Sequence, residues 1–530
     1  MTSNAADSAS SCSAVLAVDI GSSSVRAAVY VANDENFLPE LVPESAQQRA
    51  FQLREDTGAN ELVQEIEAAV AACCQALGPN KSIDDVALSC FAMNLVGLNK
   101  VGDPCTPLLT YAGSSPSIIK ASEMLHNELA DAGRLQSIRS RTGTTMSHTS
   151  YAACQMRALD EENALDNVDV FVSLPTLLLR RWTTASQLAA VSPSEASWTG
   201  LINLASLDWD EAARAMLPPR AAAALPEIKT DIAMVADLKA KADLWPQMRN
   251  ARFHLGIADG LAANVGSMCV DARSMAVTVG TSAAARILLN RSQVPLGASD
   301  FPPRGLWCYC ADGERVLLGG ALTDGGSLYR WVEDMIRLPA DADARAEACA
   351  PGSHGLIVLP FLRGERSMGW NDKAAMTISG ISQSTQPHEI LHAVMESLAI
   401  RIGELIAAIA EAASPGRPRL VASGTALAKS PLLQRLIADV TGKDLLSSRW
   451  AREEATSRGV AMLALETSSS QSSVEGNGEA NDSQGFLAKV AAKAEAGLAI
   501  ARSPAASRHA LYTDEIVPRH RTLYASLFPN

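Results

Sequence analysis

Residues 17–29 read AVDIGSSSVRAAV, and residues 276–288 read AVTVGTSAAARIL. Aligned without a gap, each stretch gives an apolar strand, a glycine followed by two hydroxyl residues, and a second apolar strand. Gly21-Ser22-Ser23 therefore corresponds to Gly280-Thr281-Ser282. The backbone N–H groups and hydroxyls at such a hairpin tip suit the oxygens of a phosphate group. Two copies in one chain predict a duplicated α/β fold, in which each half supplies one phosphate-binding turn to a central cleft.

Composition indicates a globular enzyme. The chain has 530 residues, more than one hydrophobic core usually serves, so we expect two domains. Its hydrophobic content is 47% and its charged content 19%, both ordinary for a globular protein. The net charge of −13 disfavours nucleic acid and acidic membrane surfaces as partners. No apolar run approaches the roughly 18 residues that span a bilayer.

Cysteine usage and low-complexity segments indicate the compartment and the domain limits. The ten cysteines include no CxxC pair, which predicts reduced thiols in a cytoplasmic protein. Residues 1–13 are polar and rich in Ser and Ala, and we expect a disordered tail there. A boundary near Asn250 would separate an N-terminal domain, 14–249, from a C-terminal domain, 250–530. Residues 467–484 cannot bury a core and predict a flexible insert in the second domain.

Asp19 is a carboxylate inside an apolar strand, just ahead of the first glycine turn. Burying it is costly without a partner. One interpretation is that Asp19 helps to hold Mg²⁺, through water, beside nucleotide phosphates. The other is that it hydrogen-bonds the turn amides for structure alone. Arg26, on the following strand, is either a phosphate or substrate contact or a surface charge.

Asp259 stands between an apolar strand, FHLGI, and a run of small residues, GLAANVGS, that can start a helix. An Asp at such a place is often a simple helix N-cap. It can also be a general base that takes the proton of a substrate hydroxyl as this attacks a γ-phosphoryl group. The two roles are compatible.

Three further features are less specific. The segment ASGTALAKSP, residues 422–431, is a strand, a glycine turn and a helix start, which lets a flat ring or a ribose approach the backbone. Gly364-Glu365-Arg366 predicts an interdomain ion pair beside aromatic residues. An apolar stripe predicts a long helix over Pro387–Ala413. Among the histidines, His148, His254 and His392 have no partners at metal-ligand spacing.

With these motifs the chain resembles the FGGY carbohydrate kinases, members of the actin, hexokinase and Hsp70-type ATPase superfamily, over about residues 14–465 and the last helix. VDIGSSSVR and VTVGTSAAAR resemble the two phosphate motifs of the family. GIADGLAANVGS resembles the segment with the catalytic aspartate, and VASGTALAKSPLLQRLIADVTGKDL resembles the adenosine motif. The resemblance implies two ribonuclease-H-like α/β domains around a central cleft.

The resemblance also implies an ATP-dependent sugar kinase that uses Mg²⁺. Asp259 would be the catalytic base and Asp19 the metal-binding carboxylate. The implied ATP-phosphate contacts are Gly21, Ser22, Ser23, Gly280, Thr281 and Ser282. The implied adenosine contacts are Gly320, Gly424 and Thr425. Small-molecule sugar and ATP would be the partners, with neither nucleic acid nor membrane, and a homodimer is left open.

The gluconate kinase branch fits better than the glycerol or xylulose kinases. WCYCADGERVLLGGALTDGGSLYRWV, LPFLRGERSMGWNDKAAMTISGIS and EASWTGLINLASLDWDE resemble that branch. The implied reaction is phosphorylation of D-gluconate to 6-phosphogluconate, with Met93 and Asn94 at the substrate. Asn94 replaces the branch's His, and Gly113 and Ser115 replace its Asp and Arg.

These replacements leave other functions open. One is a kinase for an uncharged ketose or polyol such as xylulose, ribulose or sedoheptulose. Another is an inactive protein that senses nucleotide or sugar. A third is an actin- or Hsp70-like ATPase acting on protein partners, which the stretches around Asp259 disfavour.

Overall fold

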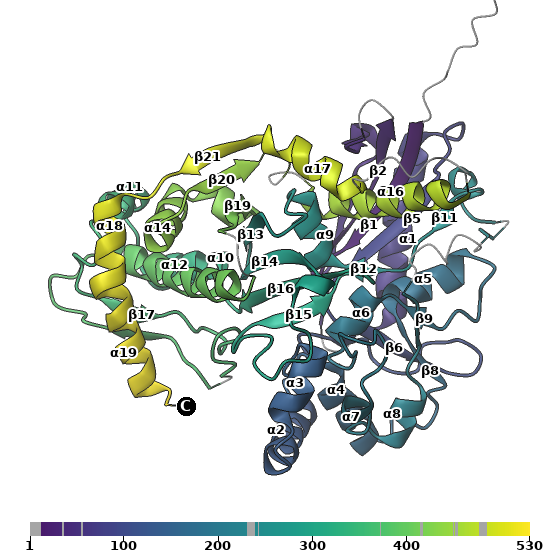
Figure 1. The fold of residues 1–530 in the computed structure, drawn as a ribbon, viewed down its shortest axis with the longest axis horizontal. Coiled ribbons are helices and arrows are strands. Elements are labelled where there is room, and N and C mark those ends of the chain that lie inside the picture. The colour runs from purple at the N-terminus through teal and green to yellow at the C-terminus, as the bar shows by residue number, and fades with distance from the viewer. Residues whose placement is uncertain are drawn as a thin grey trace, which may run out of the picture. The chain divides into compact units, whose positions relative to one another are not determined.

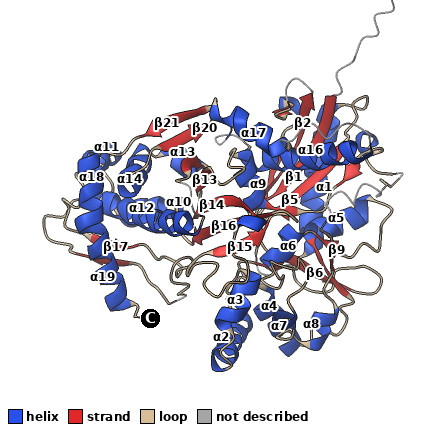
Figure 2. Cartoon of the chain, viewed as in Figure 1, coloured by secondary structure: helices blue, strands red, loops and turns tan. Residues whose placement is uncertain are grey.

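The computed structural model describes residues 12–33, 37–54, 57–230, 239–241, 243–371, 373–413, 417–448, 450, 454–475 and 485–529. It divides the chain into two compact units, each of mixed helices and strands (Figure 1, Figure 2). Unit 1 comprises Met1–Gly266, Tyr309–Glu314 and Glu454–Val490. Unit 2 comprises Ser267–Cys308, Arg315–Glu453 and Ala491–Asn530.

Unit 1 contains three sheets and a set of surrounding helices. Its strands are β1 (Cys12–Ile20), β2 (Ser24–Asn33), β3 (Glu40–Leu41), β4 (Gln47–Ala50), β5 (Asp85–Cys90), β6 (Asn94–Leu98), β7 (Leu109–Thr110), β8 (Val170–Ser173), β9 (Ala190–Val191), β10 (Glu227–Ile228), β11 (Arg252–Phe253) and β12 (Ile257–Ala258). Its helices are α1 (Ala59–Leu77), α2 (Pro116–Asp131), α3 (Leu135–Thr142), α4 (Ala152–Glu161), α5 (Leu174–Trp182), α6 (Pro193–Trp198), α7 (Glu211–Arg214), α8 (Pro219–Ala223), α9 (Asp259–Gly266) and α16 (Ala455–Glu475).

The main sheet of unit 1 has the order β11-β5-β1-β2-β3, with β12 also on β5 and β4 on β2. β1 and β2 form the antiparallel hairpin that the sequence predicts, and β5 runs parallel to β1. Apart from its first residues β1 is buried, as expected of a strand with helices on both faces. Its core contains Leu16, Val18 and Ile20 together with the apolar face of α1.

Unit 2 repeats this arrangement. Its strands are β13 (Ser274–Val279), β14 (Ala283–Asn290), β16 (Arg315–Leu322), β17 (Ile357–Leu359), β18 (Thr377–Ser379), β19 (Arg419–Ser423), β20 (Leu445–Ser448) and β21 (Leu498–Arg502). Strand β15 (Trp307–Cys310) begins in unit 2 and ends in unit 1. Its helices are α10 (Gly326–Met335), α11 (Ala342–Ala348), α12 (Pro387–Ala412), α13 (Thr425–Lys429), α14 (Pro431–Thr441), α18 (Ala506–Leu511) and α19 (Val517–Leu527), while α17 (Phe486–Glu495) runs from unit 1 into unit 2. The long helix expected over Pro387–Ala413 is α12.

The strand orders confirm the internal duplication. In unit 2 the order β16-β14-β13-β19-β20 matches β3-β2-β1-β5-β12 of unit 1. β13 pairs antiparallel with β14 and parallel with β19, as β1 does with β2 and β5. The turns differ by one residue: Ile20 pairs with Val25, whereas Val279 pairs with Ala283. The gapless alignment therefore holds up to each glycine, but it does not hold across the turn.

The limits of the units differ from the expected ones. The first segment of unit 1 ends at Gly266 and not near Asn250, because β11 and β12 pair in parallel with β5. β1 begins at Cys12, so residues 12 and 13 belong to a strand and not to a tail, and residues 1–11 lie outside the described residues. The insert expected at 467–484 begins as helix, because α16 continues to Glu475. Residues 476–484 lie outside the described residues.

Helix α16 completes unit 1 from a distant part of the chain. It packs along β1, β5 and α9 (Figure 1). The two helices cross at glycines: a Cβ on Gly266 would collide with the backbone of Ala455, and one on Gly459 with the backbone of Ala262. Only glycine allows backbones to approach this closely. In the described part of the chain, no helix combines the length and apolar character that crossing a membrane requires.

A buried carboxylate connects α16 to the amino end of β5. Asp85 is fully buried and accepts two hydrogen bonds from Arg252, at 2.9 and 2.6 Å. His254 Nε2 lies 2.7 Å from Asp85 Oδ1, and the Ser468 hydroxyl donates to the same oxygen at 3.0 Å. Burial opposes ionisation, but His254 and Arg252 together lower the pKa of Asp85. This one group therefore connects β5, the β11–β12 segment and α16.

Replacing this carboxylate should destabilise unit 1. Asp85→Asn leaves Arg252 without its ion-pair partner, and we expect a loss of about 3 kcal/mol in the free energy of unfolding at pH 7. Because folding lowers the pKa of Asp85, the wild-type advantage should shrink as the pH falls below about 4. Urea denaturation at pH 7 and pH 3.5 measures both effects. Asp166→Asn, at an exposed ion pair with Arg220, is the control and should change stability little. Equal effects of the two substitutions on stability would contradict the role of Asp85 as a buried ion-pair partner.

Candidate active site

In unit 1 the predicted carboxylates lie at the carboxyl ends of adjacent strands. Asp19 of β1 pairs with Ser89 of β5, and Ala258 of β12 pairs with Cys90 on the other side of β5. Asp259 follows at the first position of α9. Because neighbouring strands lie about 4.8 Å apart, the two carboxylates stand on strands separated by about 10 Å. The structure therefore brings Asp19 and Asp259 to one edge of one sheet.

Asp19 is buried but has partners. Its exposed fraction is 4%. The Ser89 hydroxyl donates to Oδ1 at 3.0 Å, and Arg26 Nη1 lies 3.4 Å from Oδ2. Burial raises the pKa of Asp19 to about 6, against the opposing effects of Arg26 and Ser89. Arg26 is thus an ion-pair partner of Asp19, and its Nε lies 3.8 Å from a carboxylate oxygen of Glu454.

The first glycine turn is closed by its own backbone. Gly21 N–H donates to the carbonyl of Ser24 at 2.9 Å, and Phe51 N–H donates to the carbonyl of Ser23 at 3.0 Å. Ser22 is half-buried and Ser23 is exposed. The hydroxyl residues therefore stand at the tip of the hairpin, directly after the strand that carries Asp19.

The second turn rests on the start of a helix. Thr281 and Ser282 are exposed. Gly326 N–H donates to the carbonyl of Gly280 at 2.8 Å, and Gly325 N–H donates to that of Thr281 at 2.9 Å. A Cβ on Gly325 would lie 2.5 Å from the Ser282 carbonyl, so this contact requires glycine. In the sequence the Gly325-Gly326 pair indicates only a break in regular structure before the helix that follows.

The glycine of the adenosine-like motif lies against the same turn. Gly424 has φ +86°, and a Cβ there would collide with the carbonyl of Val279, the residue before Gly280. One residue earlier, the Ser423 and Thr278 hydroxyls are 2.7 Å apart. Thr425, at the first position of α13, is exposed. Unit 2 therefore brings Gly280, Gly424 and Thr425 together, as the motifs suggest.

Three predicted contacts have close neighbours within the protein. Gly320 is buried in β16, where a Cβ would lie 2.5 Å from Leu405 and 2.9 Å from the Ser367 hydroxyl, so glycine at this position admits α12 against the sheet. Met93 is 2% exposed and belongs to the apolar cluster around β6. Asn94 donates to the Phe91 carbonyl at 2.8 Å and accepts from Leu174 N–H at 3.0 Å. Its amide therefore joins two segments of unit 1.

The ion pair expected between domains at Gly364-Glu365-Arg366 forms within unit 2. Glu365 pairs with Arg401 of α12 and accepts a hydrogen bond from the Tyr524 hydroxyl. Arg401 also lies over the rings of Phe361 and Tyr524, 5.3 and 5.4 Å from their centres. The aromatic surroundings were expected, but the partner is Arg401, which is distant in sequence.

A buried histidine pair was not foreseen. His354, His392 and Glu396 each place a ligand-type atom within 4.8 Å of the others. His354 Nδ1, however, accepts a hydrogen bond from Leu356 N–H at 3.0 Å, so the proton of a neutral ring is on Nε2. That nitrogen lies 3.2 Å from Glu396 and has no lone pair for a metal. Burial opposes ionisation of Glu396, but these histidines lower its pKa, and the cluster is better described as a carboxylate held between two buried imidazoles.

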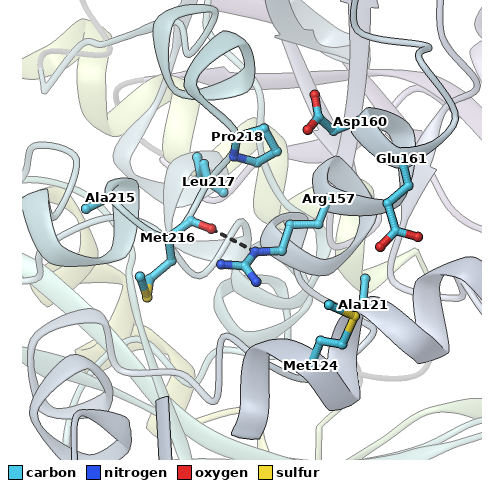
Figure 3. Close-up of a pocket in the computed structure, with 9 residues that line it drawn as sticks. All are labelled: Ala121, Met124, Arg157, Asp160, Glu161, Ala215, Met216, Leu217 and Pro218. Atoms are coloured by element: carbon cyan, nitrogen blue, oxygen red, sulfur yellow. Dashed lines mark hydrogen bonds between the residues drawn. The ribbon is translucent and has the colours of Figure 1, made fainter. Parts of the chain in front are cut away.

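A surface cavity of about 280 Å³ in unit 1 lies away from the predicted residues. In Figure 3 Arg157 reaches across it, and its Nε donates to the Met216 carbonyl at 2.8 Å. Its lining residues are Ala121, Met124, Arg157, Asp160, Glu161, Ala215, Met216, Leu217 and Pro218. The candidate site therefore rests on the sheet edge and the glycine turns, and not on this cavity.

Glu195 is a site neighbour that sequence reasoning missed. It lies on α6 with 7% exposure, and neither carboxylate oxygen has a hydrogen-bond partner among the described residues. A Cβ on Gly256 would lie 2.5 Å from Glu195 Oε1, so the carboxylate rests on the chain that leads into Asp259. Burial raises its pKa to about 7. In the sequence Glu195 is the first residue of EASWTGLINLASLDWDE, a stretch that resembles the gluconate kinase branch, but nothing in that stretch marks the residue itself as part of the site.

Comparison with known proteins gives consistent matches. Residues 14–266 match the N-terminal domain, and residues 275–467 the C-terminal domain, of the FGGY family of carbohydrate kinases. The gluconokinase of Bacillus subtilis (strain 168) is 22% identical over 444 residues, which cover 80% of this chain and 82% of that protein. Gluconate kinase from Lactobacillus acidophilus has a TM-score of 0.79 at 18% identity, over 98% of each chain. Ligand-bound xylulose kinase from the same organism has a TM-score of 0.78 at 18% identity, over 98% of this chain and 99% of the other.

Neutralising Glu195 should stabilise the protein at alkaline pH. Because folding raises the pKa of this carboxyl from 4.5 to about 7, its contribution to stability is complete below pH 4.5 and is lost as the pH rises through 7. We expect Glu195→Gln to gain about 3 kcal/mol over the wild type at pH 8 and less than about 1 kcal/mol at pH 5. Urea denaturation at the two pH values measures the difference. A gain that does not depend on pH would show that the carboxyl ionises normally.

The contact between Gly424 and Val279 can be tested against a matched glycine. Gly78 has a similar φ, +90°, but a Cβ there would meet nothing within 4 Å. Both Gly→Ala variants should carry the backbone strain of about 1–3 kcal/mol. Gly424→Ala adds the collision with Val279, so it should lose more stability and also weaken binding of ADP. Urea denaturation and calorimetric ADP titration measure the two effects. Equal costs and unchanged ADP affinity would remove this contact from the site.

Proposed function

Because the chain belongs to the FGGY family of carbohydrate kinases, we propose that it transfers the γ-phosphoryl group of ATP to a hydroxyl of a sugar or sugar acid, with Asp259 as general base. The family resemblance of the motifs and the two-domain kinase fold are confirmed by the matches. The observation that supports this division of roles is the placement of Asp19 and Asp259 on either side of β5. A single sheet edge then serves both the phosphate chain and the acceptor.

Asp259 is suited to proton transfer by its position. It is half-buried at the first position of α9, where the helix dipole stabilises a negative charge. The acceptor hydroxyl would donate its hydrogen to the Asp259 carboxylate as its oxygen attacks the γ-phosphorus. ADP leaves with the electrons of the broken bond, and the proton remains on Asp259 until product release.

The glycine turns would bind the phosphate chain. Ser22 and Ser23 of unit 1 and Thr281 and Ser282 of unit 2 offer hydroxyl donors at hairpin tips. Such donors stabilise the negative charge that spreads over the phosphoryl oxygens in the transition state. Gly424 and Thr425 would accommodate the adenosine, because the glycine lets the ligand approach the backbone.

The surroundings of Asp19 fit Mg²⁺. Mg²⁺ prefers carboxylate oxygens and keeps several waters, and Asp19 is a carboxylate beside a phosphate-type turn. When bound, Mg²⁺ neutralises charge on the phosphates. Asp19 holds its orientation through Ser89 and Arg26, which favour the ionised carboxylate that a metal needs.

Two acceptors are favoured by different observations. The gluconokinase relative supports D-gluconate, with 6-phosphogluconate as product. The xylulose kinase neighbour, and the uncharged Gly113 and Ser115, support a ketose or polyol. We also propose that the protein acts in the cytoplasm without nucleic acid or membrane partners, which its net charge of −13 and free cysteines support. Homodimer formation and the inactive sensor stay as alternatives.

The base is tested by an isosteric change. We expect Asp259→Asn to lower kcat by about 10²–10⁴-fold, because the amide cannot accept the proton, while ADP affinity stays near that of the wild type. A coupled assay of ADP release with ATP and Mg²⁺ measures kcat for D-gluconate, D-xylulose, D-ribulose, sedoheptulose and glycerol, with a sugar-free control. Asp160→Asn, at the surface cavity, is the matched control. A fully active Asp259→Asn variant would remove Asp259 from the mechanism, and sugar-independent ATP hydrolysis would favour the ATPase alternative.

A further inference from the structure

The end of the sheet that carries Asp259 has a second, unexplained carboxylate. Glu195 lies on α6, and two neighbours attach this helix to the chain before Asp259. The Ser192 hydroxyl donates to the carbonyl of Gly256 at 2.6 Å, and Ala258 N–H donates to the Ser194 hydroxyl at 3.1 Å. The side chain of Glu195 itself rests on Gly256. Its position is therefore fixed relative to the β12 strand and to the start of α9.

The pKa of Cys90 depends on the charges around the carboxyl end of β5. This buried thiol ends β5, between the strands that carry Asp19 and Asp259. Burial raises its pKa first, and then the charges of Glu195, Asp259 and Asp19 raise it further, in that order. Glu195, Asp259 and Asp19 therefore all lie close enough to Cys90, at the carboxyl end of β5, to disfavour a further negative charge there, and Glu195 has the largest effect of the three.

Glu195 differs from Asp19 because no positively charged side chain among the described residues compensates its charge. Asp19 pairs with Arg26. For Glu195, only the Ser173 hydroxyl and the backbone at Ser192 favour the ionised form, and no described arginine, lysine or histidine contributes. The Ser173 hydrogen is directed to the Thr176 hydroxyl, 3.0 Å away. Keeping such a group beside the reacting carboxylate costs stability, which indicates that it serves the reaction.

Residues 111–115, where the family resemblance implies the acceptor, provide no positive charge either. They read YAGSS. A Cβ on Gly113 would lie 2.9 Å from the Gln155 amide, so a larger side chain here would have to displace Gln155. Ser115 caps α2, where it accepts from Ile118 N–H. An acceptor with its own carboxylate would therefore meet two carboxylates and no countercharge from these residues.

We propose that Glu195 determines specificity: its charge selects an uncharged polyhydroxy acceptor, a ketose or a polyol, and disfavours a sugar acid. This inference rests on the proposed kinase function and decides between its two acceptor classes. Glu195 acts through its field on the acceptor that Asp259 deprotonates, so direct contact is not required. Low polarity around the buried group keeps that field strong.

The selection should depend on pH. The charges of Glu195, Asp259 of α9 and Asp19 of β1 all act on Cys90 of β5, and the Ser173 hydroxyl at the end of β8 favours the ionised form of Glu195. It is half ionised near pH 7 because burial raises its pKa to about that value. As the pH rises from 6 to 8.5 its negative charge forms, while a sugar acid stays ionised throughout. The preference for an uncharged acceptor should therefore increase over this range, on the order of ten-fold.

The test compares two acceptors that differ in one group. D-gluconate carries a carboxylate where D-glucitol carries a hydroxymethyl group, and D-xylulose serves as the uncharged acceptor if it reacts faster than D-glucitol. The ratio of kcat/KM for the uncharged acceptor to that for D-gluconate is measured from pH 6 to pH 8.5. If D-gluconate gives no turnover, its inhibition constant against the uncharged acceptor replaces its kcat/KM. General losses of activity cancel in this ratio.

Four proteins decide the outcome. The wild type and Glu161→Gln, a surface control, should show the rise in the ratio, and Glu195→Asp should keep it. Glu195→Gln should flatten it and improve D-gluconate at pH 8.5 by about ten-fold. A flat ratio in the wild type, the same rise in Glu195→Gln, or turnover of D-gluconate alone would overturn the inference and leave the kinase function intact. Absence of turnover with every acceptor, although ATP binds, would overturn the proposed function itself.

Discussion

Strand β5 is the constraint on which the rest of the site depends. It is flanked by parallel neighbours on both sides, with β1 on one and the β11–β12 segment on the other. Parallel strands end together, so residues that follow them meet at one edge. That edge receives Asp19, Cys90 and Asp259, while Asp85 at the opposite end of β5 connects the strands and α16 through its ion pairs. The positions of Asp19 and Asp259 at one end of this strand therefore depend on the ion pair and hydrogen bonds of Asp85 at the other end.

The two units show how one fold was adapted to two tasks. The position of Asp19 in unit 1 corresponds to Thr278 in unit 2, and each faces a serine of the next strand, Ser89 or Ser423. In unit 1 the serine donates to a carboxylate, whereas in unit 2 two hydroxyls bond each other. In unit 2 the glycines Gly325 and Gly424 let backbone segments approach the second turn closely. At these positions unit 1 carries a charged carboxylate, whereas unit 2 carries hydroxyls and glycines that leave the backbone uncovered.

Sequence reasoning performed well where local pattern decides structure. Both hairpins, α12 and the strand-to-helix step at Asp259 follow from periodicity and turn residues, and the motif resemblance identified the family. It did not reach the contacts that long-range packing decides. The sequence around Gly320 does not show its approach to Leu405, and the sequence around Met93 does not show the apolar cluster that buries its side chain. Glu195 was missed because its contact with Gly256 joins residues that are distant in the sequence. The first segment of unit 1 extends beyond Asn250 because the short strands β11 and β12 pair with β5.

Helix α16 has a consequence for the order in which the protein is made. Unit 1 needs Glu454–Val490, yet the segments of unit 2 up to Glu453 leave the ribosome earlier. Until residues 454–490 are made, β1 and α9 lack the helix that packs on them. The close contact between Gly266 and Gly459 cannot form before that point. Translation therefore delivers most of unit 2, all but Ala491–Asn530, while the unit with both carboxylates is still unfinished. Completion of the amino-terminal unit during synthesis thus waits for a segment that begins at Glu454, in about the last seventh of the chain.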